Sequence, residues 1–236
     1  MITAPTNRLL DALSPASQEL ILRSSKHMPL PVRMVLMEAE QRPQFAYFPT
    51  EGIASVVVEL EEGGVAEVAL IGREGVVGGL QMLGPALAST RCFMQVEGSG
   101  YRIPFATLKQ LFLESEEIRT RVLEMVQQQS LTVSQLAACN KLHEAEPRLA
   151  RWLLMVRDRV QQDTLHITQE FLAQMLGTQR TTVVMAAGAL QRSGLVAYSR
   201  GRITILSVEH LEDAACDCYQ QAKKLYNKLY QPLTSG

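Results

Sequence analysis

Hydrophobic and polar positions follow two different periods along the chain, and the first is the period of β-strands. Short apolar runs fill the first hundred residues, and glycine or proline interrupts them about every ten residues. The runs span residues 32–37, 45–48, 53–60, 65–71, 90–96 and 100–103. Runs of this length and spacing predict antiparallel strands that close into a barrel or a double-sheet roll. One helix is expected before the strands, at residues 15–24, and another after them, at 105–113.

The second period is helical, and it first appears between about residues 115 and 144, where no glycine or proline occurs. Residues in this stretch recur at alternating spacings of four and three: Ile118, Val122, Met125, Gln129, Thr132, Leu136, Cys139 and His143. An unbroken heptad pattern over 26 residues, roughly 39 Å of helix, favours a parallel two-stranded dimer interface. The alternative is a single helix that lies on its own roll, and the polar members of the pattern weaken the predicted seam.

Residues 168–193 predict two short helices joined by a tight turn. Thr168 suits the N-cap of the first helix, and Gly177 suits a left-handed stop at its end. A second helix is expected to begin near residue 178 or 179, with Val183, Ala187 and Leu190 on its buried face. This pattern is typical of a helix-turn-helix, which places its second helix in the major groove of DNA. The alternative is an ordinary helical hairpin with a solvated polar face.

The exposed start of the second helix carries side chains that suit base recognition. These residues are Gln179, Arg180, Thr181, Thr182 and Met185. Arginine and glutamine pair bidentately with guanine and adenine, and a threonine methyl can pack on a thymine methyl. We therefore predict that these residues, together with Thr168, contact DNA.

The segment from 193 to 206 predicts two strands joined by a turn. Leu195, Ala197, Ile203 and Ile205 alternate with polar residues, and Gly201 interrupts the alternation. A strand hairpin after a recognition helix is a wing. Arg200 and Arg202 flank the expected tip, where guanidinium groups can reach phosphates on either side of the groove.

Composition and charge agree with a nucleic-acid partner. With 236 residues, 47% of them hydrophobic, the chain can form large cores, and its apolar runs are too short to predict a membrane span. The net charge of −1 conceals an asymmetry: residues 146–202 carry eight basic and four acidic residues, or +4, whereas residues 1–115 carry nine and twelve, or −3. The basic excess coincides with the helix-turn-helix. The first residues do not resemble a signal peptide, so we expect a cytoplasmic protein with reduced cysteines.

A roll, a long helix and a winged helix in this order resemble the Crp/Fnr superfamily of bacterial transcription regulators. The resemblance covers nearly the whole chain and is sharpest at residues 47–53, 68–79, 148–154, 168–190 and 201–205. It implies an α+β protein with a cupin-like, cyclic-nucleotide-binding-like roll at 1–114, a dimerisation helix at 115–145, a winged helix-turn-helix at 146–207 and a C-terminal helix and tail at 208–236. It further implies a homodimer on a pseudo-palindromic double-stranded operator, and it leaves contact with RNA polymerase open.

Departures from the family limit what the resemblance implies about ligands. Members that bind cyclic AMP carry a Gly-Glu-Leu segment, whose glutamate accepts a bond from the ribose, followed by an Arg-Ser or Arg-Thr pair. Here the segment is Gly78-Gly79-Leu80, and Arg91 follows Ser89-Thr90 instead of preceding such a pair. We therefore expect an unidentified effector other than cyclic AMP, with Arg73 and Arg91 as candidate anion partners. The alternative is a ligand-independent dimer in which the roll only holds two copies together.

The recognition helix departs as well. Its best-known form reads the operator with an Arg-Glu pair and a second arginine one turn later. Here Arg180 is kept, Thr181 stands in the glutamate position and Met185 replaces the second arginine, so we expect a different operator.

Metal and catalytic chemistry are not predicted. An iron–sulfur cluster needs several thiolates, whereas no cysteine precedes Cys92. Cys216 and Cys218 are too close in sequence to bind a tetrahedral metal by themselves, and on a helix their thiols would point apart. The histidines lie in no haem-attachment motif. Some cupins are enzymes, but metal-ligand spacing, phosphate loops and nucleophile motifs are missing from this sequence, so we expect a non-enzyme.

Overall fold

The computed structural model describes residues 6–84 and 87–231. The chain divides into two compact units. Unit 1 comprises Met1–Val56, Ala69–Leu131 and Leu225–Gly236, and unit 2 comprises Val57–Val68 and Thr132–Lys224. The outer ends of the predicted 1–114 and 208–236 segments, at residues 1–5 and 232–236, lie outside the described residues.

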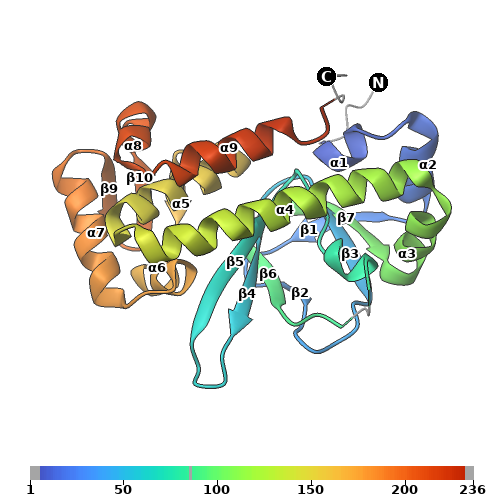
Figure 1. Ribbon diagram of the computed structural model, residues 1–236, viewed down its shortest axis with the longest axis horizontal. Helices are drawn as coiled ribbons and strands as arrows, with labels where there is room; N and C mark the ends of the chain where they lie inside the picture. The colour runs from blue at the N-terminus through green and yellow to red at the C-terminus, as the bar shows by residue number, and fades with distance from the viewer. Residues whose placement is uncertain (1–5, 85–86, 232–236) are drawn as a thin grey trace. The chain divides into compact units, whose positions relative to one another are not determined.

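Two sheets form the roll (Figure 1). The first has the strand order β1-β7-β3 and contains β1 (Lys26–Leu30), β7 (Gly98–Pro104) and β3 (Phe45–Pro49). The second has the order β2-β6-β4-β5 and contains β2 (Val35–Met37), β6 (Arg91–Val96), β4 (Ile53–Glu59) and β5 (Val65–Ile71). β7 pairs antiparallel with both neighbours, and β2 pairs antiparallel with β6. The predicted α+β class with antiparallel sheets is confirmed.

The N-terminal edge of the roll differs from the prediction. The sequence did not predict β1 because Pro29 interrupts its pattern, and β1 lies at the edge of its sheet, where proline is tolerated. The strand predicted at 32–37 is wrong in its first half, because Arg33 has a φ of 67° and only Val35–Met37 form β2. The short helix α1 (Arg8–Asp11), capped by Asn7, was also not predicted.

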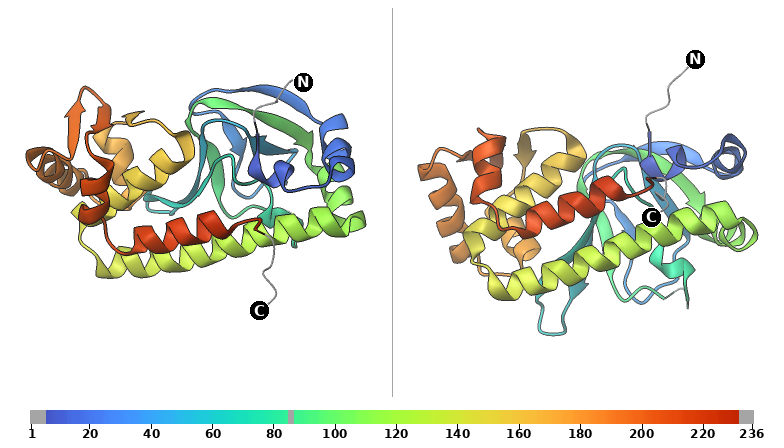
Figure 2. Two further views of the ribbon diagram at one scale, coloured as in Figure 1. Left: turned by 90° about the horizontal axis from the view of Figure 1, so that it is seen from above. Right: turned by 45° about the horizontal axis from the view of Figure 1, so that its top comes forward.

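Helices pack on the roll and complete its core (Figure 2). They are α1, α2 (Pro15–Arg23), the 3-10 turn η1 (Leu80–Met82), α3 (Phe105–Glu114) and the first part of α4 (Glu116–Leu142). One buried cluster contains residues from helices and strands alike, among them Leu9, Ile21, Phe48, Ile103, Leu108 and Ile118. Their burial provides the main stabilisation of unit 1.

The predicted dimer seam on α4 is wrong at its first three positions. Ile118, Val122 and Met125 belong to the buried cluster of their own unit and are 0%, 0% and 4% exposed. The fit is close, since a Cβ added at Gly79 would lie 2.6 Å from Met125 Cε. A heptad pattern identifies the buried stripe of a helix without identifying what covers it, and here the chain's own roll does.

The later seam positions differ from one another in exposure. Thr132 and Cys139 are 9% and 1% exposed in the single chain, and Cys139 packs against other cysteines of unit 2. Buried side chains are not accessible to a second copy, so the seam prediction fails at these two positions. Gln129 and Leu136 are half-buried, and at these positions the seam stays a prediction.

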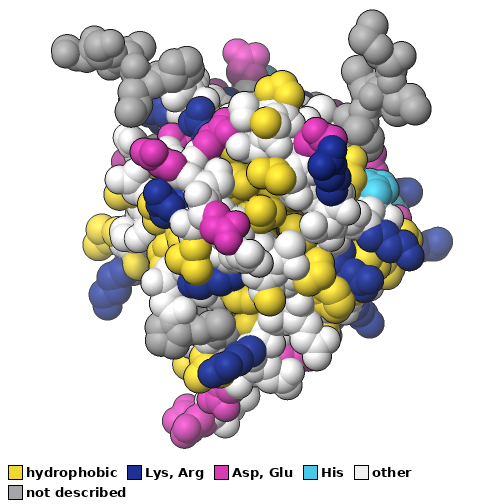
Figure 3. All heavy atoms as spheres, turned by 90° about the vertical axis from the view of Figure 1, so that its right-hand side faces the viewer, with side chains coloured by type: hydrophobic (Ala, Val, Ile, Leu, Met, Phe, Trp, Pro, Cys, Tyr) yellow, Lys and Arg dark blue, Asp and Glu magenta, His cyan; other side chains and the backbone are white. Residues whose placement is uncertain are grey.

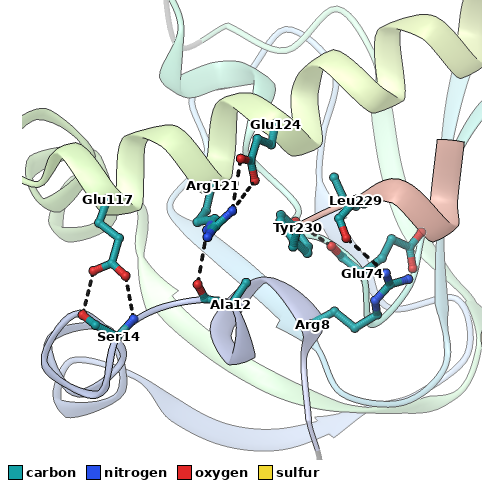
Figure 4. Close-up of polar contacts among 9 residues, drawn as sticks. All are labelled: Arg8, Ala12, Ser14, Glu74, Glu117, Arg121, Glu124, Leu229 and Tyr230. Atoms are coloured by element: carbon teal, nitrogen blue, oxygen red, sulfur yellow. Dashed lines mark hydrogen bonds and ion pairs between the residues drawn. The ribbon is translucent and has the colours of Figure 1, made fainter. Parts of the chain in front are cut away.

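Polar contacts join the N-terminal helices and the last described residues to unit 1 (Figure 4). Ser14 donates to Glu117 of α4 from its backbone N at 2.6 Å and its Oγ at 2.7 Å. Bonds from Ser17 and Ser14 hold the pKa of Glu117 below its usual value. Tyr230 Oη donates to the Glu74 carbonyl at 2.8 Å, and Arg8 Nη2 donates to the Leu229 carbonyl at 3.3 Å. Leu229 and Tyr230, which follow α9 (Cys218–Lys228), are thereby part of unit 1.

One face of unit 1, formed over α2 and α3, carries side chains of every kind (Figure 3). Basic, acidic and hydrophobic groups are intermingled there, and Leu20 and Leu113 are 47% and 62% exposed. Mixed charge does not create the positive potential that nucleic acid requires. This face is therefore a poor candidate for a DNA contact.

Unit 2 surrounds the helix-turn-helix with further helices and a small sheet. Its elements are α5 (Ala145–Val160), β8 (Thr164–His166), α6 (Gln169–Leu176), α7 (Arg180–Arg192), β9 (Val196–Ser199), β10 (Arg202–Ile205), α8 (Val208–Ala214) and most of α9 (Cys218–Lys228). The sheet has the order β8-β10-β9 and is antiparallel; β8 was not predicted. Trp152 of α5 is 2% exposed, and its Nε1 donates to Glu67 Oε1 at 2.8 Å. None of the described helices combines the length and the hydropathy needed to cross a membrane.

Candidate nucleic-acid interface

Local backbone chemistry fixes both helices of the helix-turn-helix. Thr168 Oγ1 accepts a bond from Phe171 N at 3.2 Å, which caps the start of α6. Gly177 ends α6 with a φ of 57°, a left-handed conformation that glycine adopts at little cost. Gln179 is extended and precedes the first residue of α7. The turn between the helices is therefore three residues long, from Gly177 to Gln179.

The predicted DNA-reading side chains lie at the solvent-exposed start of α7. Gln179, Arg180 and Thr181 are exposed, and Met185 is 66% exposed. Thr182 is half-buried.

The opposite face of α7 is buried, with Val183, Ala187 and Leu190 at 0%, 2% and 0% exposure. Val184, which is 43% exposed beside Met185, was not predicted. Two neighbouring apolar side chains on a polar helix face could have identified it, because such groups can contact thymine methyls.

Side-chain hydrogen bonds connect the elements around the helix-turn-helix. The Arg148 guanidinium donates to the Leu176 carbonyl, which connects α5 to the end of α6, and burial lowers the pKa of Arg148. Tyr198 N donates to Gln191 Oε1 at 3.0 Å, which connects β9 to the last turn of α7. Tyr198 Oη donates to the Ile167 carbonyl at 3.1 Å. Side-chain hydrogen bonds thus connect the helix-turn-helix to α5 through Leu176 and to the wing through Gln191.

The wing has a two-residue tip formed by Arg200 and Gly201. Both have positive φ, 49° and 73°, and they connect the paired residues Ser199 and Arg202. Positive φ at both central residues defines a type I′ turn. Arg200 and Arg202 are exposed, so both guanidinium groups are accessible at this end of unit 2.

The strand faces of the wing differ in part from the prediction. Ile203 and Ile205 are buried as expected, but β9 buries Val196, which is 1% exposed, and exposes Ala197. A one-residue change of register inverts a strand, and two consecutive apolar residues left the register ambiguous.

The residues proposed for an effector pocket have varied surroundings. Arg91 Nε forms an ion pair with Glu38 Oε2 at 3.2 Å. The positive charge of Arg73 attracts the carboxylate of Asp11. Leu80 and Ser89 are exposed, and Thr90 is half-buried. Gly78 and Gly79 are both buried, and Gly79 makes room for a core methionine.

One buried polar group in the roll was not predicted. Gln95 of β6 is 5% exposed, and within the described residues neither its amide oxygen nor its amide nitrogen has a hydrogen-bond partner. Strand alternation would expose Gln95, because its neighbour Met94 is buried, whereas the structure buries both side chains. The sequence therefore carries no signal that could have found Gln95.

Four residues that the sequence did not predict to form one site come together in unit 2. The ligand atoms of Cys139, His143, Cys216 and Cys218 all lie within 4.8 Å of one another. The interpretation of the last two cysteines as incidental is wrong, because Cys216 precedes α9 and the two thiols do not project from one helix. A hydrogen bond from Cys139 holds the pKa of Cys216 below its usual value. The cysteine and histidine four residues apart at the end of α4 are the signal that could have found this cluster.

Known proteins share the helix-turn-helix of unit 2. A family model for a Crp-like helix-turn-helix domain matches residues 147–214. No protein of curated function matches the chain.

Several solved structures are similar to this chain over most of its length. Their sequence identities are low, so the similarity shows the fold alone. A transcriptional regulator described as Crp/Fnr family from Eubacterium rectale has a TM-score of 0.70 and 19% identity, covering 87% of this chain and 96% of that one. The c-di-GMP-responsive global regulator CLP of Xanthomonas campestris has a TM-score of 0.69 and 16% identity, covering 82% and 100%. A Crp-family transcriptional regulator from Thermus thermophilus has a TM-score of 0.66 and 21% identity, covering 80% and 96%.

Proposed function

Since the chain carries a Crp-like helix-turn-helix domain at residues 147–214 within the Crp/Fnr fold, as the resemblance predicted, we propose that it is a dimeric transcription regulator that binds a pseudo-palindromic operator. One observation carries the proposal. The exposed start of α7 presents Gln179, Arg180 and Thr181 on a buried scaffold, next to a wing whose tip carries two exposed arginines.

The side chains have distinct roles in this proposal. Arg180 reads guanine through a bidentate pair, and Gln179 and Thr181 contact neighbouring base edges. Met185 supplies an apolar contact to a thymine methyl. Arg200 and Arg202 bind phosphates, which fixes the register of α7 without reading sequence.

The dimer contact in this proposal uses the face of α4 that the single chain leaves exposed. Residues on this face recur at alternating spacings of three and four: Thr120, Leu123, Gln127, Ser130, Ser134 and Ala137. Heptad spacing suits a two-stranded contact, and the short side chains allow close approach of two helices. A helix-turn-helix reads two half-sites one DNA turn apart, which requires a two-fold partner.

The roll in this proposal binds a small effector other than cyclic AMP. The buried amide of Gln95 supports a bound polar molecule, because an unpaired buried amide costs roughly 1–3 kcal/mol and a ligand could satisfy it. The same observation disfavours the ligand-independent alternative. The proposed site of action is the cytoplasm, where the DNA is.

Selection of operators from random duplex DNA, followed by binding measurements, tests the assignment. The wild-type protein should enrich a two-fold symmetric sequence. Arg180→Ala should weaken binding by ~1–3 kcal/mol per half-site and relax one base position in each. Arg192→Ala is the matched control, because Arg192 is an exposed arginine at the opposite end of α7. Enrichment of no symmetric sequence, or an unchanged preference in Arg180→Ala, would contradict the proposal.

A further inference from the structure

The cysteine and histidine cluster of unit 2 has the composition of a metal site. Cys139 lies in the last turn of α4, and His143 follows one turn later, with its backbone N bonded to the Cys139 carbonyl at 3.0 Å. Cys216 lies in the connection between α8 and α9, and Cys218 is the first residue of α9. Two ligands four residues apart on a helical turn project to the same side, and the start of α9 and the residues before it supply the other two.

The distances fit one tetrahedral ion. Cys139 Sγ and Cys216 Sγ are 3.4 Å apart, and Cys218 Sγ and His143 Nδ1 are 3.6 Å apart. Zinc bound at ~2.3 Å from sulfur and ~2.0 Å from nitrogen separates tetrahedral ligands by roughly 3.5–3.8 Å. An iron–sulfur cluster distributes its cysteines over several iron atoms. Four ligand atoms within 4.8 Å of one another suit a mononuclear centre instead.

Neighbouring polar groups support the same geometry. His143 directs Nδ1 toward the cluster, and its Nε2 lies 3.6 Å from Asp217 Oδ1. Metal-bound imidazoles commonly place the second ring nitrogen on a carboxylate, which orients the ring. Gln135 Nε2 also donates to Cys218 Sγ at 3.2 Å, a contact that stabilises a thiolate.

Charge and burial favour an anionic centre here. The three thiols are between 1% and 8% exposed, whereas the His143 side chain is 33% exposed and leaves an approach for an ion. Arg151 is 4% exposed, acts electrostatically on Cys139 and Cys216, and has an Nε without a hydrogen-bond partner among the described residues. Three thiolates and one divalent ion carry a net charge of −1, which this buried guanidinium can balance.

We propose that Cys139, His143, Cys216 and Cys218 bind one zinc ion in a tetrahedral Cys3His site. The ligands flank the matched helix-turn-helix domain, two before residue 147 and two after residue 214. The ion therefore closes this segment into a loop between its two ends. Closing a long loop stabilises a folded segment by restricting its unfolded chain. The site is independent of DNA binding and does not require the proposed function to be correct.

Elemental analysis of the reduced full-length protein tests the proposal, with Co²⁺ replacing zinc as a spectroscopic probe. One ion per chain is expected, with the intense visible bands of tetrahedral Co²⁺ and near-ultraviolet thiolate charge transfer. The double variant Cys139→Ser/Cys216→Ser should lose stoichiometric binding. Cys92→Ala is the matched control, since Cys92 is a buried cysteine of the roll outside the cluster.

A second variant keeps the test informative if the serine variants do not fold. Asp217 has an 81% exposed side chain, so Asp217→Asn should fold normally and bind Co²⁺ about 10–100-fold more weakly. Failure of the reduced protein to bind Co²⁺ would overturn the proposal. So would full binding by the double serine variant, acid-labile sulfide in the purified protein, or a Cys139–Cys216 disulfide that persists under reducing conditions.

Discussion

Arg200 occupies a left-handed backbone conformation at the wing tip, where its φ is 49°. A non-glycine residue in this conformation costs roughly 1–2 kcal/mol. The neighbouring Gly201, with a φ of 73°, meets the same requirement without that penalty. An arginine at the strained position of an exposed turn therefore points to a role for its guanidinium group outside the fold, and phosphate binding is the role we propose.

Arg200→Gly should separate folding from DNA binding. The free energy of unfolding should rise by roughly 0.5–1 kcal/mol, because relief of the left-handed strain exceeds the added entropy of glycine. The slope of log affinity against log salt concentration should fall by about 1 for each arm of the operator, because one phosphate contact is lost. Urea denaturation and salt titrations of operator binding measure the two effects. An unchanged salt slope would remove Arg200 from the interface.

Single residues also show where sequence reasoning stops. Thr168 and Gly177 could be assigned to helix ends because capping depends on a few neighbouring residues. The side-chain contacts of Cys139 could not be predicted, because they depend on Cys216, a residue 77 positions away. Gln95 illustrates the same limit, since its buried and unpaired amide is a property of packing.

Among the elements, long periodic segments are predictable and short ones are not. The sequence predicts α4 and α7 because each repeats its pattern over several turns. The three-residue strand β8 and the four-residue helix α1 are too short to establish a period. For α4 the pattern identified the buried stripe, which includes Ile118 and Val122. The stripe was expected to contact a partner helix, whereas it packs in the core of its own roll.

Leu123→Glu tests the revised position of the dimer contact. Leu123 is 42% exposed, so the substitution should leave the monomer folded and weaken the dimer at least tenfold, or about 1.4 kcal/mol. Sedimentation equilibrium measures the dissociation constant. Leu20→Glu on α2 is the matched control at 47% exposure and should leave the dimer intact. Equal dimer strength in both variants would exclude this face of α4.

For the whole molecule, the packing of the roll against α4 constrains the ligand. A glutamate at position 79 would require Met125 to move, because its Cβ would lie 2.6 Å from Met125 Cε, the flexible end of that side chain. The ribose-binding carboxylate that the family resemblance places at this position would therefore require repacking of this core. The missing motif and the tight packing agree with each other.

Thermal denaturation with cyclic nucleotides should reflect this constraint. We expect cyclic AMP to leave the melting temperature unchanged. A ligand at 100 times its dissociation constant adds about 2.7 kcal/mol and would be readily detected. Cyclic di-GMP belongs in the same experiment, because a similar regulator responds to it. A clear shift with cyclic AMP would show that another residue replaces the carboxylate, and Arg91→Gln would then be the first variant to measure.

Residues 57–68 comprise the end of β4, the turn after it and the start of β5, and they group with unit 2 although they lie within the sequence of the roll. Glu67 in this hairpin accepts the indole N–H of Trp152. Exchanging only the C-terminal half of this chain for that of another regulator would separate these partners and leave a buried donor or acceptor unmatched. A chimaera with a new DNA specificity therefore needs two transplanted segments, the hairpin and the helix-turn-helix, inherited from the same parent.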